Sequence, residues 1–139
     1  LGSLVRRPEF FDVYLDLAIE FGLPIRLPSG SAERAIGFPF RALAAEEGVV
    51  FPDHFSYVAT VGSRHALAAA IEALEPGVTE LHARPALDTP EQRAFDDHWP
   101  ERVDDHHLLC FDAALYRQIE RSGAVLIGFR ELRTLQRSN

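Results

Sequence analysis

The 139-residue sequence has no lysine, no methionine, a single cysteine and no long apolar run. All 14 basic residues are Arg, and 21 acidic residues give a formal net charge of −7. An acidic chain without a cluster of basic residues lacks the positive surface that a nucleic-acid backbone or an anionic membrane requires. We therefore expect neither nucleic acid nor a membrane among its partners.

Cys110 is the only cysteine, so an intrachain disulfide is impossible. A reducing compartment is the default for such a chain, and we expect a cytoplasmic protein. No apolar run approaches the roughly 18 to 20 residues that cross a bilayer, and the first residues lack the apolar core of a signal peptide. Because Cys110 lies within the apolar run LLCF, we interpret it as a buried, unreactive thiol.

Several common catalytic motifs are missing as well. The sequence contains no glycine-rich phosphate loop, nucleophile elbow, zinc-binding cysteine pair or HExxH helix. The densest set of potential metal ligands is DDHH at residues 104–107, with DDH at residues 96–98. Adjacent residues on a helix diverge by about 100° and cannot all face one ion, so we interpret this set as a solvated helix surface.

The pattern of apolar residues predicts alternating helices and strands within one domain, residues 1–139. Helical spacing begins at Pro8 and ends at Gly22, and further helices are predicted at residues 41–47, 66–74, 113–121 and 130–136, with another opening at Pro90. Short apolar runs at residues 23–27, 49–51, 78–83 and 124–129 are predicted strands. Continuous apolar strands between helices are typical of a mostly parallel sheet covered by helices.

Four predicted strands are too few to close a barrel of about eight. We therefore expect an α/β fold that forms a partial TIM-like (β/α) barrel, with an open sheet as the alternative. In such folds the catalytic groups lie at the carboxyl ends of the strands. The polar residues that follow the predicted strands are Arg26, Asp53, His54, His82, Arg84 and Arg130.

Two of these sets suggest chemistry, and each has a structural alternative. Asp53 and His54 could transfer protons or bind a metal, but adjacent residues reach one site only if the chain turns there, and an exposed loop pair is as common. His82 and Arg84 share one face of a strand, where Arg84 could clamp a carboxylate, a phosphate or a developing oxyanion. Alternatively, Arg84 forms a structural ion pair with Asp88 or Asp53.

Taken in order, several segments resemble the YdjC-like carbohydrate deacetylases of the ChbG/HpnK type. The opening RPEFF at residues 7–11 and GLPIRLP at residues 22–28 are similar to the middle of the family pattern. The late part of the pattern is represented by GVTEL at 77–81, PALDTPE at 85–91, RVDD at 102–105 and LIGFREL at 126–132. The likeness covers nearly the whole chain, which then corresponds to the C-terminal half of the family.

The resemblance implies a TIM-like barrel that hydrolyses the N-acetyl group of an amino sugar or oligosaccharide with a divalent metal, Mg or Zn. Such a metal polarises the amide carbonyl and lowers the pKa of a bound water, and an acid protonates the leaving amine. The resemblance places the metal ligands upstream of the segment that matches Leu1, so we expect no metal to bind to this chain alone.

The late strand departs from the family pattern, which often has His before Pro where this chain has Arg84 before Pro85. Either His82 substitutes from the same face, or Arg84 acts instead, or the acid role is lost. We assign His82 and Arg84 as candidate catalytic residues and Arg26, Asp53 and His54 as candidate substrate contacts.

The altered late strand and the partial barrel lead to two further expectations. The alternative function is a non-catalytic α/β module that binds a sugar or a partner protein. A half-barrel also leaves strand edges uncovered, which favours a homo-oligomer.

Overall fold

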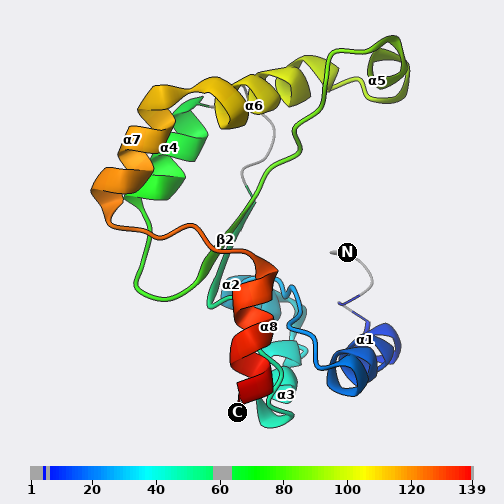
Figure 1. The fold of residues 1–139 in the computed structure, drawn as a ribbon. Helices are drawn as coiled ribbons and strands as arrows, with labels where there is room; N and C mark the ends of the chain where they lie inside the picture. The colour runs from blue at the N-terminus through cyan, green and yellow to red at the C-terminus, as the bar shows by residue number, and fades with distance from the viewer. Residues whose placement is uncertain (1–4, 6, 58–63, 139) are drawn as a thin grey trace. The chain divides into compact units, whose positions relative to one another are not determined.

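The structure, a computed structural model, describes residues 5, 7–57 and 64–138 (Figure 1). Helices account for most of it. The elements are α1 (Pro8–Phe21), α2 (Gly30–Ile36), α3 (Phe40–Glu46), β1 (His54–Tyr57), α4 (Arg64–Glu72), β2 (Thr79–His82), α5 (Pro90–Phe95), α6 (Trp99–Phe111), α7 (Ala113–Ser122) and α8 (Phe129–Ser138).

The chain divides into two compact units. The first unit comprises the described residues within Leu1–Phe55, Gly77–Glu80 and Leu126–Asn139, and the second comprises those within Ser56–Pro76 and Leu81–Val125. The first unit therefore contains α1, α2, α3 and α8, whereas the second contains α4, α5, α6 and α7.

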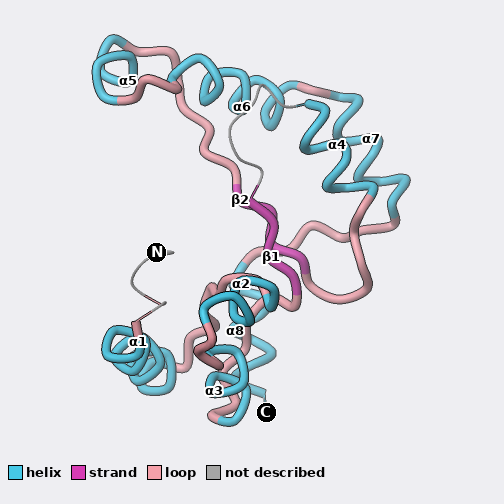
Figure 2. The backbone as a smooth tube through the Cα atoms, turned by 180° about the vertical axis from the view of Figure 1, so that it is seen from behind, coloured by secondary structure: helices cyan, strands magenta, loops and turns pink. Residues whose placement is uncertain are grey.

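Strands β1 and β2 pair as a small, open, parallel sheet (Figure 2). The amide of His54 donates to the carbonyl of Val78 across a distance of 3.0 Å. The prediction of an α/β fold is confirmed at this level, with a helix-rich structure and a small parallel sheet. Within the described residues the sheet has two strands and does not close, so the structure does not show a TIM-like barrel.

Of the four predicted strands, residues 78–83 are confirmed as β2, while residues 23–27 and 49–51 are not strands. These two runs do touch, because the amide of Ile25 donates to the carbonyl of Val50 at 2.9 Å. Pro24, Pro28 and Pro52 interrupt or border them, and proline has no N–H to donate to a ladder. Strand β1 begins instead two residues after Pro52, at His54.

The predicted strand at residues 124–129 is wrong. Residues 124–128 form neither helix nor strand, and Phe129 is the first residue of α8. Val125 and Leu126 are 81% and 71% exposed. An apolar run becomes a buried strand only where a neighbouring strand and a covering layer accept it, and within the described residues no strand pairs with this one.

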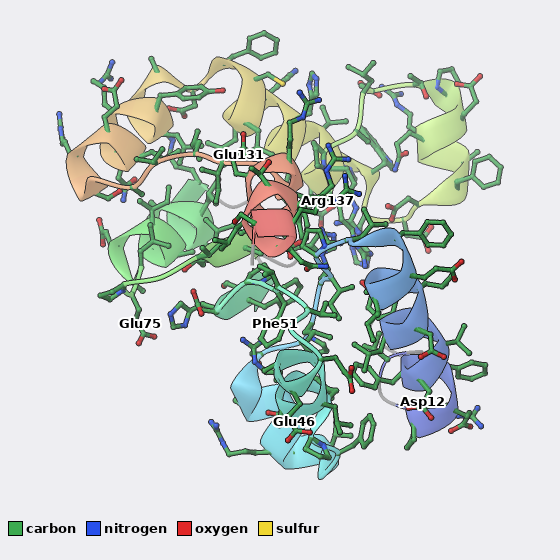
Figure 3. All side chains as sticks on the ribbon, turned by 60° about the horizontal axis from the view of Figure 1, so that its bottom comes forward. Asp12, Glu46, Phe51, Glu75, Glu131 and Arg137 are labelled. Atoms are coloured by element: carbon green, nitrogen blue, oxygen red, sulfur yellow. The ribbon has the colours of Figure 1, made fainter. Side chains whose placement is uncertain are left out.

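Helix α1 begins and ends as the sequence predicts. Pro8 occupies the first turn, and Gly22 adopts the left-handed conformation at φ 57°. The amide of Leu23 then closes the helix end on the carbonyl of Ala18 at 2.9 Å. Arg137 of α8 lies at the same end (Figure 3), where it donates to the carbonyls of Phe21 at 3.0 Å and Gly22 at 3.2 Å. A cation there also favours the helix dipole.

The first unit has its own hydrophobic core. Phe11 of α1 packs edge-on against Phe38, with ring centroids 5.4 Å apart, and both rings lie 6.3 Å from Phe40. The buried members of this core are Val5, Phe11, Ala18, Ile25, Leu27, Phe40, Ala44 and Val49. Four of them lie outside α1 and α3, so this core orders the extended segments as well as the helices.

Helices α4 and α7 lie side by side in the second unit, as the ribbon and the backbone tube both show (Figures 1 and 2). Their core consists of Leu67, Ile71, Leu108 and Leu115. Asp112 caps α7, because its Oδ1 accepts from the amides of Ala114 at 2.8 Å and Leu115 at 3.0 Å. The other oxygen of Asp112 pairs with Arg64.

Helix α6 carries the acidic and histidine residues at 104–107. Its buried charge is Arg102, whose Nε donates to Asp96 at 3.0 Å. The prediction that Cys110 is buried is wrong, since its thiol is exposed. An apolar run on a helix turns only part of its length toward the core, and Cys110 falls on the other side. Among the described helices, none is long and apolar enough to cross a membrane.

Two adjacent phenylalanines test the core of the first unit. Phe11 is fully buried, whereas Phe10 is 42% exposed. We expect Phe11→Ala to lower the free energy of unfolding by about 3 to 5 kcal/mol, because it removes a buried ring from a packed aromatic cluster. Phe10→Ala, the matched control, should cost about 1 kcal/mol or less. Urea denaturation of both variants makes the comparison, and equal losses would contradict this packing.

Candidate functional site

Arg26 lies in the extended segment after α1, and Tyr14 holds its backbone. The Tyr14 hydroxyl accepts a hydrogen bond from the amide of Arg26 at 3.1 Å and donates to the Arg26 carbonyl at 3.4 Å. Burial raises the pKa of the Tyr14 phenol above its ordinary value, against the opposing effect of its contact with Arg26. Tyr14 is therefore a neutral hydroxyl near pH 7, able to donate and accept at once.

The side chain of Arg26 forms an ion pair with Glu80 of β2, between Nη2 and Oε1. The Arg26 side chain is 35% exposed, while that of Glu80 is only 10% exposed. Both oxygens of Glu80 and the Nε of Arg26 are buried, and none has a hydrogen-bond partner within the part of the chain that is described. The guanidinium of Arg26 is thus paired with a buried carboxylate, while the Arg26 side chain as a whole remains partly open to solvent.

Sequence reasoning missed Glu80 as a site residue and treated it only as part of the GVTEL segment. A signal was present, because Glu80 precedes His82 by two positions and strand alternation assigns such residues to one face. The ion pair with Arg26 could not be seen, because it joins segments that are far apart in the sequence.

Asp53 stabilises the turn that precedes β2. Its Oδ2 accepts a hydrogen bond from the amide of Val78 at 2.8 Å. Gly77, just before, has φ 118°, and a Cβ at this position would lie 2.7 Å from the same Oδ2. The Asp53 carboxylate is therefore committed to shaping this turn, and its predicted contact with substrate stays a prediction.

Arg41 of α3 is a second residue that the sequence did not reveal. Its Nη1 donates to the carbonyl of Pro28 at 3.0 Å, and its Nη2 donates to those of Pro52 at 2.9 Å and Asp53 at 2.8 Å. The guanidinium also stacks 4.7 Å from the ring centre of Phe51, which Figure 3 labels. Burial lowers the pKa of Arg41, while the carboxylates of Glu33 and Asp53 oppose this effect. Arg41 thus joins the segment after Arg26 to the one before β1.

The remaining predicted site residues lie on or after the two strands. His54 is the first residue of β1 and His82 the last of β2, both half-buried, and Arg84 is exposed two residues further on. All three have interaction partners in the structure. Arg26, Asp53 and His54 belong to the first unit, whereas His82 and Arg84 belong to the second.

Asp88, the alternative ion-pair partner considered for Arg84, binds Arg93. The two side chains make paired contacts of 2.6 Å and 2.7 Å. The hydrogen bond with Arg93 lowers the pKa of Asp88. Arg130, which also followed a predicted strand, is exposed near the start of α8.

Metal-ligand side chains do not converge among the residues described here: no three His, Cys, Asp or Glu side chains lie together in a way that could hold an ion. The described residues therefore do not fit a metal centre by themselves. The site assembled in the first unit is instead an arginine held between a tyrosine hydroxyl and a buried glutamate.

The YdjC-like protein family matches residues 3–119 of the chain, and the chain belongs to this family. The family is carbohydrate-deacetylase-like, and the match does not distinguish the ChbG and HpnK types. Comparison with curated proteins and with solved structures gives no match. The family resemblance stated from the sequence is thereby confirmed.

Gly77 tests the role of Asp53 in shaping the turn. We expect Gly77→Ala to lower the free energy of unfolding by about 2 kcal/mol or more, because φ 118° strains an L residue and the new Cβ meets Asp53 Oδ2. Gly37→Ala is the matched control: Gly37 also has a positive φ, 75°, but no atom lies within 4 Å of its Cβ position. The loss of stability in Gly37→Ala should be about 1 kcal/mol.

Chemical denaturation of these two variants measures the difference directly. If Gly37→Ala and Gly77→Ala lose the same stability, the close approach of Asp53 to Gly77 contributes nothing.

Proposed function

We propose that the parent protein of this chain hydrolyses the N-acetyl group of an amino sugar or oligosaccharide, with a divalent metal, Mg or Zn, held by residues outside this chain. The observation that carries the proposal is the family match over residues 3–119. Carbohydrate is accordingly the expected substrate. From the single cysteine we also infer a reducing, cytoplasmic location.

Arg26 is the residue that we assign to substrate binding with most structural support. Its backbone is fixed by Tyr14 and its guanidinium by Glu80, so little freedom remains to be lost when a ligand binds. Asp53, just before β1, and His54, its first residue, belong to the same unit and remain proposed substrate contacts.

His82 and Arg84 are the proposed catalytic pair, and their chemistry differs. An imidazolium can give a proton to the leaving amine, whereas a guanidinium stays protonated and can only stabilise negative charge on the amide oxygen. Substitution of a proton donor and substitution of an oxyanion partner should therefore have different effects on kcat and on its pH profile.

Acetate release from N-acetylated chito-oligosaccharides tests the proposal, with the full-length parent assayed beside this chain. We expect activity from the parent. His82→Gln in the parent should lower kcat by about 100-fold or more if His82 protonates the amine. Arg84→Gln should lower kcat with little change of the pH profile if Arg84 stabilises the oxyanion.

Two exposed residues provide matched controls, His65→Gln on α4 and Arg117→Gln on α7. Neither should change kcat by more than about twofold. A full-length parent that releases no acetate from any N-acetylated sugar would contradict the proposed activity.

A non-catalytic module that binds a sugar or a partner protein is the second candidate. The observation in its favour is Arg84, which stands before Pro85 where the family often has His. Under this alternative, substitution of His82 or Arg84 changes affinity alone, and the parent shows no turnover for them to affect.

We also propose that the chain forms a homo-oligomer. Its described residues expose several large apolar side chains, among them Phe95 at 90%, Val125 at 81% and Leu126 at 71%. Exposed apolar residues next to one another favour association. Light scattering should give a mass above 15.5 kDa, and Leu126→Asp should shift the mass toward the monomer. A monodisperse monomer of the unaltered chain would contradict this proposal.

A further inference from the structure

The Arg26–Glu80 pair combines one buried and one partly exposed partner. Glu80 lies nine-tenths buried in β2, and both of its oxygens are inaccessible to solvent. Arg26 keeps about a third of its side chain open, 35% by surface. A ligand that arrives from solvent can therefore reach the Arg26 side chain but not the carboxylate oxygens of Glu80.

A contribution to the free energy of unfolding does not by itself explain why this ion pair is present. Burying the Glu80 carboxylate is costly, and its attraction to a partly exposed Arg26 offsets this cost only when the remaining polar atoms are also satisfied. Here Glu80 Oε1 contacts the Arg26 Nη2, whereas Glu80 Oε2 and the Nε of Arg26 have no hydrogen-bond partner within the described chain. A buried pair with such incomplete hydrogen bonding stabilises a fold no more than apolar residues of similar volume would, although removing one partner alone is costly. This points to a further role for the exposed partner.

The pair also changes what Arg26 can bind. An unpaired arginine attracts carboxylates and phosphates through its charge. A guanidinium that contacts a buried carboxylate keeps its outward N–H donors, but its charge is largely cancelled. Tyr14, the other side chain that holds Arg26, is neutral and adds no charge of its own. Such a donor suits a neutral oxygen, as in a hydroxyl or an amide carbonyl.

We propose that Glu80 is a positioning residue that holds the Arg26 guanidinium and cancels its charge, so that this point of the site binds uncharged hydroxyl or amide oxygens and disfavours anions. The identity of that ligand as a neutral N-acetylated sugar rests on the proposed function. The charge cancellation does not, because it follows from the buried pair itself.

A titration with sodium acetate at constant ionic strength tests the charge cancellation without any sugar. The readout is the NMR signal of the Arg26 Nε–H group in the whole 139-residue chain. The unaltered chain should show no saturable shift, whereas Glu80→Gln, which keeps the shape and removes the charge, should bind acetate at Arg26. Glu9→Gln is the matched control, since it breaks an Arg–Glu pair whose side chains are 64% and 55% exposed, and it should leave the Arg26 signal unchanged.

Saturable acetate binding to Arg26 in the unaltered chain would overturn the proposal. An unchanged Arg26 signal in Glu80→Gln would overturn it as well. If Glu80→Gln does not fold, Glu80→Asp replaces it. This variant retains the charge at a greater separation from Arg26 and should bind acetate weakly. Acetate binding by the unaltered chain still decides whether the charge of Arg26 is cancelled.

Sugar binding supplies the second arm, with N,N′-diacetylchitobiose as the neutral probe and a hyaluronan tetrasaccharide as the anionic one. The unaltered chain should prefer the neutral sugar, and Glu80→Gln should shift the ratio of the two Kd values by about tenfold toward the anionic sugar. Failure to bind either sugar, with the acetate result as expected, would count against the proposed function and leave the role of Glu80 intact. A ratio that Glu80→Gln does not change would overturn the role of Glu80.

Discussion

The contact on which the first unit depends is the ion pair between Arg26 and Glu80. It ties the extended segment after α1 to strand β2, although these segments lie far apart in the sequence. Tyr14 secures the Arg26 backbone from α1, and Asp53 secures the turn that leads into β2. Together these polar contacts fix where β2 begins relative to the segment that carries Arg26, which the apolar core alone would not specify.

Arginine side chains make several of the long-range polar contacts among the described residues of this lysine-free chain. Arg41 reaches three backbone carbonyls from one helix, and Arg137 reaches two at the end of α1. A planar fork with several donors can satisfy carbonyls on separate segments at once, which an ammonium group does less well. These residues therefore act as connectors between segments that have few ladder hydrogen bonds of their own.

Helices were predictable from the sequence because their signals are local. Pro8, Gly22 and Asp112 mark helix ends through contacts with residues only a few positions away. Strands were less predictable, because an apolar run such as residues 124–129 becomes a strand only if a distant segment pairs with it. The expected TIM-like barrel requires several such strand pairings, whereas the described residues form one pair, β1 with β2.

The candidate site was predictable in part for the same reason. Arg26 stood out as a polar residue after an apolar run. Glu80 and Arg41 did not, because their importance comes from partners that are distant in the sequence. The family resemblance was recognisable because it rests on an ordered set of short segments, and the match over residues 3–119 confirms it without placing any one residue in the chemistry.

A double-mutant cycle on the free energy of unfolding tests the central contact most directly. The variants are Arg26→Gln, Glu80→Gln and the double substitution, each compared with the unaltered chain by urea denaturation. If the ion pair holds these segments together, the sum of the stability losses of the two single variants should exceed the loss of the double variant. The difference, which is the coupling energy, should be about 2 kcal/mol. Strictly additive losses would mean that Arg26 and Glu80 do not depend on each other, which would contradict this account.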